Sequence, residues 1–256
     1  MTDWLTVEEL AGVAFGAADV VMANEAHDGW RRCERTRRVG VRLVRAAHDL
    51  GVRDLAMEAL PAPRPREPES WTGQVAVEGA YLAQPDMREL TGTALGLGWR
   101  LWSYEAWTDP ELSATPELLV TQEHTNRRER EQALNIAVIA ERVPRLLVWC
   151  GNGHATRSVC DDWIPMGYRY VEATGRRPYV VDQTVTVNWN DQEQYLPDGV
   201  LEALQRELAP YGGTAAVRRE DADERLQPYD ADAFVLSLDN AMTEYDPYGA
   251  RRHEQA

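Results

Sequence analysis

The chain has 256 residues, of which 44% are hydrophobic and 27% charged, and its formal net charge is −15 at pH 7. This composition is too apolar for a disordered chain and is typical of a globular protein with a sizeable core. The acidic balance repels phosphate groups and anionic lipid, so we expect no nucleic-acid partner and no membrane partner.

Segment lengths and cysteine usage indicate a cytoplasmic protein. No hydrophobic run reaches the length of a membrane-spanning helix, and the acidic start MTDWLTVEEL differs from a secretory signal. Cys33, Cys150 and Cys160 are odd in number and fit no zinc spacing and no disulfide framework. We therefore expect reduced thiols that pack in the core.

The first predicted elements are a helix and a buried strand. Residues 5–17 are expected to form the helix, with Thr6 as the N-cap and Glu9 at capping-box spacing. Residues 19–23, DVVMA, then predict the first strand.

A second helix is expected from about Trp30 to Leu50, where apolar residues recur at helical spacing, with Gly51 as its C-cap. The segments that follow are predicted as a strand at 52–58, a proline-rich loop at 60–70, a helix at 86–97 and a strand at 99–105.

A long helix dominates the middle of the chain. It is expected at 122–142, after a proline-bearing loop at 108–118, and Pro144 marks its end. Strand 145–150 follows, then a turn and helix start in GNGHATRSVCDDWI. The later segments are predicted as strands at 168–173 and 178–189, a helix at 197–208, a strand at 232–240 and a frayed tail at 245–256.

This alternation predicts a single α/β domain over residues 1–256. Its mostly parallel central sheet should be covered by helices on both faces, with additional C-terminal strands. The core motifs lie at 19–156, and 165–240 is expected to extend the sheet.

Polar side chains follow four of the predicted strands. In a parallel sheet the carboxyl ends of the strands lie along one edge, where ligands bind. We therefore expect these side chains to share one cleft. In chain order they are Asn24, Glu25 and His27, then Glu58, then Tyr104 and Glu105, then Gly151, Asn152, Gly153 and His154.

Such a set of imidazoles and carboxylates can activate water by acid/base chemistry. It could instead hold a divalent metal (Mn, Co, Zn or Ni) through His27 and His154 with one or two glutamates. The backbone N–H groups of the helix expected after Gly153 could bind an oxyanion.

These motifs resemble the superfamily of erythromycin esterase-like, ChaN-like haem-uptake and Tiki/TraB proteins. The resemblance rests on Asn24-Glu25-Ala26-His27, on Glu58, on the helix segment Arg128 to Ile136, and on Gly151-Asn152-Gly153-His154. Relatives usually have glycine where Asn24 stands, and asparagine tolerates the positive φ of such a turn.

The resemblance implies an α/β fold with a hydrolytic or metal-dependent site. By this resemblance, His27 would be the general base, Glu25 its orienting partner and Glu58 a second acid/base group. His154 would polarise or hold the leaving side, and Arg128 would stabilise negative charge or pair with a carboxylate. The expected substrate contacts are Asn24, Tyr104, Glu105, Asn152 and Gly153.

We expect the substrate to be a small, apolar molecule of the secondary-metabolite kind, and the reaction to be ester or lactone hydrolysis or a related cyclisation or displacement. Two alternatives remain open. One is a ChaN-like protein that binds haem or another small ligand, with Tyr104, Tyr168 and Tyr170 as candidate phenolates. The other is a catalytically idle subunit with a partner protein from the same pathway.

Overall fold

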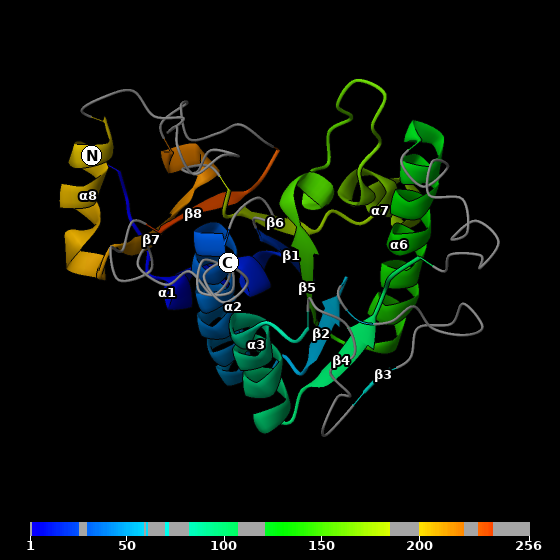
Figure 1. Ribbon diagram of the computed structural model, residues 1–256, viewed down its shortest axis with the longest axis horizontal. Helices are drawn as coiled ribbons and strands as arrows, with labels where there is room; N and C mark the ends of the chain where they lie inside the picture. Colours follow the sequence, from blue (N-terminus) through cyan, green and yellow to red (C-terminus); the bar gives the residue numbers. More distant parts are fainter. Residues whose placement is uncertain are drawn as a thin grey trace, which may run out of the picture.

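The computed structural model describes residues 2–25, 30–58, 60, 70–71, 82–106, 121–184, 200–222 and 230–237. These residues form a central sheet with helices on both faces (Figure 1). The strands, in chain order, are β1 (Val20–Glu25), β2 (Asp54–Met57), β3 (Ser70–Trp71), β4 (Arg100–Ser103), β5 (Leu146–Gly151), β6 (Tyr179–Asp182), β7 (Thr214–Arg218) and β8 (Ala233–Ser237).

The sheet of the described residues has eight strands in the order β3-β4-β2-β5-β1-β6-β8-β7. The six inner strands pair in parallel, and the edge strands β3 and β7 are antiparallel to their neighbours. The predicted α/β fold with a mostly parallel sheet is therefore confirmed.

Two hydrophobic clusters, one on each face, hold the helices to the sheet. One cluster contains buried residues of α1, α2 and α3, and the other contains those of α6, α7 and α8. The helices are α1 (Val7–Ala17), α2 (Trp30–Asp49), α3 (Pro85–Gly96), α6 (Gln122–Arg142), α7 (Met166–Thr174) and α8 (Val200–Leu208).

The first helix begins as the sequence predicts. The Thr6 hydroxyl accepts from the backbone N–H of Glu9 at 3.1 Å, and the Glu9 carboxylate accepts from the N–H of Thr6 at 2.8 Å. This reciprocal cap satisfies two backbone donors that the first turn would leave unpaired. The long helix predicted at 122–142 is also confirmed, as α6.

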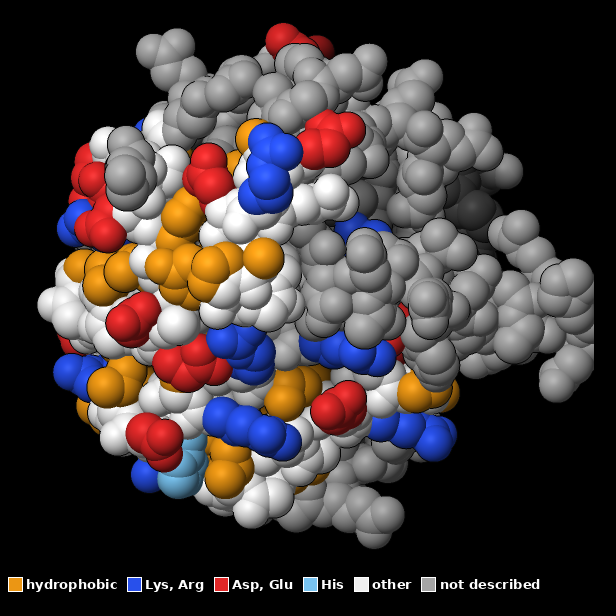
Figure 2. Space-filling model, turned by 90° about the vertical axis from the view of Figure 1, so that its left-hand side faces the viewer, with side chains coloured by type: hydrophobic (Ala, Val, Ile, Leu, Met, Phe, Trp, Pro, Cys, Tyr) orange, Lys and Arg blue, Asp and Glu red, His pale blue; other side chains and the backbone are white. Residues whose placement is uncertain are grey.

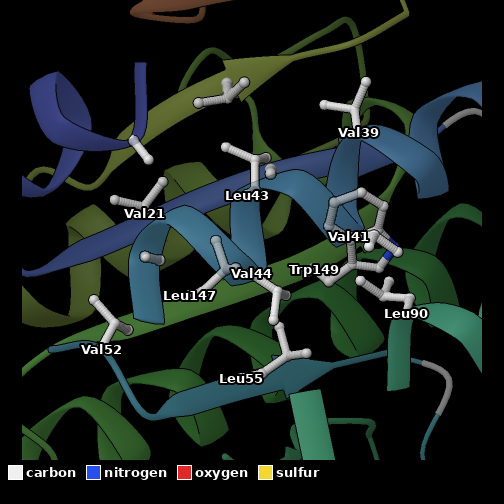
Figure 3. Packing of buried hydrophobic residues seen from close by; sticks show 14 of the residues in the cluster. Val21, Val39, Val41, Leu43, Val44, Val52, Leu55, Leu90, Leu147 and Trp149 are labelled. Atoms are coloured by element: carbon white, nitrogen blue, oxygen red, sulfur yellow. The ribbon is translucent and has the colours of Figure 1, made fainter. Parts of the chain in front are cut away.

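Close packing of α2 on the sheet depends on a missing side chain. A Cβ on Gly40 would lie 2.6 Å from Cη2 of Trp149, so only glycine lets the helix approach the indole. Figure 3 shows Trp149 of β5 beside Val39 and Val41 of α2 within this cluster. The Trp149 ring is almost completely buried.

Two predictions about the second half are wrong, and one strand was not predicted. Residues 168–173 lie inside helix α7, because Met166, Gly167 and Tyr170 form its buried face. Strand β7 was not predicted, although four of its five residues are buried. The predicted helix start after β5 is a single 3₁₀ turn, η1 (Asn152–Ala155).

Two smaller differences concern the sheet edge and the cysteines. Ser70 and Trp71 form β3, although the predicted loop included Ser70. Cys150 is buried as expected, whereas Cys160 is exposed. The loop predicted at 108–118 and the tail at 245–256 lie outside the described residues, as does the second part of the predicted strand at 178–189.

Among the described helices, none combines the length and the apolar character that crossing a membrane requires. The face shown in Figure 2 carries arginine and acidic side chains next to one another with hydrophobic ones between them. The described part of that face has no continuous basic patch.

Candidate functional site

The carboxyl ends of β4, β2 and β5 lie side by side in the sheet. The next described helix after β2 is α3, which packs on one face of the sheet, and the next after β5 is α7, which packs on the other. Neighbouring strands whose following helices lie on opposite faces form a topological switch point, which is where ligands bind in open α/β sheets. The candidate site lies at this point.

Arg128 of α6 joins the ends of β2 and β4. Its Nη2 donates to Glu58 at 2.6 Å and to Glu105 at 2.7 Å, and its Nε donates to Glu105 at 3.0 Å. Burial disfavours the charged guanidinium, but Glu105 and Glu58 outweigh it and hold the pKa of Arg128 above its usual value. The other oxygen of Glu58 accepts from the N–H of Gly151 at 2.9 Å, which ties this pair to β5.

His154, in the turn η1 after β5, completes the cluster. Its Nδ1 lies 2.5 Å from Oε1 of Glu129, and its Nε2 lies 3.9 Å from Oε1 of Glu58. Burial alone would lower the pKa of His154. Glu58 and Glu129 outweigh burial and the nearby Arg128, and the pKa rises to about 9. The ring is therefore an imidazolium at neutral pH.

Glu129 is the site residue that sequence reasoning missed. Its side chain has no exposed surface. A charged run such as the one around it is typical of a solvated helix face, but α6 buries a stripe of residues spaced three or four apart. The members of this stripe are Glu129, Gln132, Ala133, Ile136 and Ile139. Extending the apolar spacing of 133, 136 and 139 backwards would have placed position 129 inside.

Glu25 does not join this cluster. It lies on the α2 side of the sheet, fully buried, where it accepts from Nε of Arg37 at 2.7 Å and from Nε1 of Trp149 at 2.9 Å. His27, its expected partner, lies outside the described residues. The structure thus brings together Glu58, Glu105, Arg128 and His154, and it places Glu25 elsewhere.

Asn24 has a structural role rather than the expected substrate contact. It is buried within β1, its amide donates to Asp182 at 2.8 Å, and its oxygen accepts from the N–H of Gln183 at 2.7 Å. These bonds tie the end of β1 to the end of β6. Because Asn24 continues the strand, it has no need of the positive φ expected for its position.

The other expected substrate contacts differ in exposure. Tyr104 is fully buried and its hydroxyl donates to the carbonyl of Trp149 at 3.0 Å, so its ring is part of the core. Glu105 is partly exposed beside Arg128. Asn152 and Gly153 belong to the turn η1, where Gly153 is buried and the side chain of Asn152 lies outside the description.

Three features outside the carboxylate cluster also bear on the expected chemistry. The oxyanion site expected at a helix start has no helix to form it, because η1 is a single turn of four residues. Burial raises the pKa of Cys150 well above its usual value, so this thiol stays protonated and is a poor nucleophile. Tyr170, one of the candidate haem phenolates, is buried in the core.

The described residues do not fit the expected divalent metal. They contain no group of three or more His, Cys, Asp or Glu side chains placed to hold an ion. The guanidinium of Arg128 already pairs with both Glu58 and Glu105, and Glu129 faces Nδ1 of His154. His27, the other expected ligand, is not among these residues.

The comparisons with known proteins assign no family to this chain. No family model and no curated protein matches the chain. The solved type III effector HopBA1 is similar at 12% identity and a TM-score of 0.46, over 94% of this chain and 98% of that one. A structure described as bacterial protein toxins is similar at 13% identity and a TM-score of 0.42; the match covers 70% of this chain and 36% of that one.

Proposed function

We propose that the protein is an acid/base enzyme that hydrolyses an ester or lactone of a small, apolar, secondary-metabolite-like molecule. The observation that carries this proposal is the placement of His154 between the carboxylates of Glu129 and Glu58, beside Arg128, at the sheet edge. Titratable groups with strongly shifted pKa values at a switch point are typical of reaction sites.

In this proposal His154 is the proton donor. A base, which the family resemblance assigns to His27, takes a proton from water as the water oxygen bonds to the carbonyl carbon. The bond from that carbon to the leaving oxygen then breaks, and Nε2 of His154 gives its proton to that oxygen. The exposed part of Arg128 stabilises negative charge on the way.

We also propose a distant relationship to the erythromycin esterase-like superfamily. It is supported by the grouping of Glu58, Arg128 and His154, which come from three separate motifs of the resemblance. The same groups would serve a cyclisation or displacement within one substrate, since those reactions also need a base and a proton donor. A cytoplasmic location, where thiols stay reduced, suits the free Cys150 and Cys160.

The proposal is tested by hydrolysis of two substrate sets, alkyl lactones and p-nitrophenyl esters, followed at constant pH. An alkoxide leaving group needs a proton donor more than p-nitrophenolate does. We therefore expect His154→Gln to lower kcat/KM about 100-fold or more for lactones, and less for aryl esters.

The matched control is His48→Gln, which changes a part-exposed histidine at the far end of α2 and should leave both activities unchanged. Absence of hydrolysis by the wild-type protein on both sets, or an unchanged rate in His154→Gln, would reject the proposed function.

A further inference from the structure

We propose that Glu129 is a positioning residue that keeps a proton on Nδ1 of His154, so that Nε2 is the ring nitrogen presented to substrate. This inference rests on the proposed function for its catalytic meaning. Its structural content is independent of any substrate.

The Glu129 carboxylate is itself held in place. Its Oε2 accepts from the N–H of Met166 at 2.6 Å, and its Oε1 accepts from Nε1 of Trp163 at 3.2 Å. The side chain is fully buried, so no water competes for these oxygens. A carboxylate with both oxygens fixed cannot turn away from the imidazole.

The two ring nitrogens of His154 face different groups. Nδ1 of His154 lies 2.5 Å from Oε1 of Glu129, and an ionised carboxylate can only accept a hydrogen bond. The pair meets the distance of a hydrogen bond but not its angle, so it is the ion pair with Glu129 that favours a proton on Nδ1. Nε2 is 3.9 Å from Glu58, beyond hydrogen-bond distance, and the side chain keeps 19% of its surface exposed. Nε2 is thus the nitrogen that a substrate atom can reach.

The plane of the His154 ring is also fixed. The indole of Trp163 packs edge-on against His154, with ring centroids 5.8 Å apart and planes at 82°. Trp163 therefore holds both members of the pair, one through its N–H and the other through its ring edge. A histidine oriented by a buried carboxylate is a recurrent way to set the tautomer and basicity of a reacting imidazole.

The charged groups that face the imidazole come from two elements. Glu129 and Arg128 come from α6, and Glu58 comes from the end of β2, with Glu105 behind Arg128. Two carboxylates close to the ring against one guanidinium favour the protonated form. The Glu129 carboxylate thus sets the tautomer of His154, and Glu58 and Glu129 together favour its charged form.

The test is nuclear magnetic resonance of histidine ring nitrogens in ¹⁵N-labelled protein between pH 6 and 10, with the His154 signals assigned by loss in His154→Gln. In the wild type we expect a strongly deshielded Nδ1-bound proton and, above the titration midpoint, the Nδ1–H tautomer. In Glu129→Gln we expect the deshielded signal to disappear and the midpoint to fall by about one pH unit.

The control is Glu141→Gln, which neutralises an exposed glutamate on the same helix and should change neither quantity. Glu129→Asp keeps the charge and should keep a midpoint above that of Glu129→Gln. A wild-type His154 in the Nε2–H tautomer overturns the inference without any variant, as does an unchanged midpoint in Glu129→Gln.

A purely structural ion pair would alter stability on substitution and leave the pH dependence of turnover in place. The positioning role predicts that Glu129→Gln moves the alkaline limb of the lactone kcat/KM profile to lower pH, in step with the nuclear magnetic resonance midpoint. If the resonances behave as expected but the protein hydrolyses nothing, the positioning holds and the proposed function fails.

Discussion

A Cβ on Gly167 would lie 2.1 Å from the carbonyl oxygen of Ala155. Gly167 is in the first turn of α7, and Ala155 ends the turn that carries His154, so the helix rests directly on the site. We expect Gly167→Ala to destabilise the fold by about 1–3 kcal/mol through overpacking, measured by urea unfolding.

Gly92→Ala is the control for this substitution. Gly92 is exposed in α3, and a Cβ there would meet nothing within 4 Å. The Gly92→Ala substitution should stabilise the protein by up to about 1 kcal/mol, because alanine has a higher helix propensity than glycine. Equal urea midpoints for Gly167→Ala and the wild type would show that α7 does not need this close contact.

Removing Arg37 should be the more damaging of two arginine deletions in α2. Arg37 is almost fully buried and pairs with Glu25 at 2.7 Å and Asp86 at 2.8 Å. Arg37→Met removes the guanidinium that pairs with these two buried carboxylates, at a cost of about 3–5 kcal/mol. The exposed Arg45→Met is expected to stay within about 0.5 kcal/mol of the wild type.

A double variant separates the pair from its surroundings. Adding Glu25→Gln to Arg37→Met removes one of the buried carboxylate charges that Arg37 balances, so the double variant should unfold at a higher urea concentration than Arg37→Met alone. Additive losses from the two substitutions would contradict the pairing.

The clamp at the site edge should contribute less, because Arg128, Glu58 and Glu105 are all partly exposed. We expect Arg128→Met to cost about 1–3 kcal/mol after allowance for solvent screening. Arg128→Lys should lower the free energy of unfolding by a similar amount, since one ammonium group cannot reproduce the forked bonds to two carboxylates.

Arg130→Met on the same helix is the comparison, since Arg130 is exposed. Urea unfolding of all three variants measures the difference. A loss for Arg128→Met no larger than that for Arg130→Met would mean that the clamp contributes nothing to stability.

Stability should depend on pH through His154. Its pKa is about 9 in the fold against an ordinary value of 6.5, so the folded state binds the proton more tightly. The resulting stabilisation is fully present below pH 6.5 and is lost as pH rises through 9. Its size is on the order of 3 kcal/mol, since the two pKa values differ by about 2.5 units and each unit corresponds to about 1.4 kcal/mol.

The measurement is the difference in unfolding free energy between the wild type and His154→Gln at pH 6 and at pH 9.5. Subtraction is needed because Cys150, whose pKa is raised by burial, also destabilises the fold as its unfolded thiol ionises in alkali. That contribution is common to both proteins and cancels. A difference that stays constant across this range would contradict the raised pKa.

Helix and strand positions followed from local patterns wherever one face of an element is apolar. The capping box at Thr6 and Glu9, the apolar spacing of α2 and the long run of α6 each depend on neighbouring residues in the chain, and the structure confirms all three. The meeting of polar groups from the ends of β2, β4 and β5 also followed, because parallel strands share an edge, whereas Asn24 and Glu25 at the end of β1 lie apart from it.

Local sequence patterns did not predict the secondary structure where contacts with distant elements decide it. The segment at 168–173 alternates in a way that suits a strand, and contact with α6 and the turn η1 makes it helical. The end signals of α7, Pro165 at its N-cap and Gly175 with a φ of 67°, were nevertheless present in the sequence. Strand β7 is short and alanine-rich, and it is stabilised by its antiparallel pairing with β8.

The sequence by itself determined the elements of the first half of the chain and the edge of the sheet that carries polar groups, because periodicity and capping act over a few residues. Only the tertiary structure decided which carboxylates meet which cations. Glu25 pairs with Arg37 on one face, while Glu129 and Glu58 flank His154 on the other. These pairings depend on the face of the sheet against which each helix packs, and therefore on contacts between residues far apart in the chain.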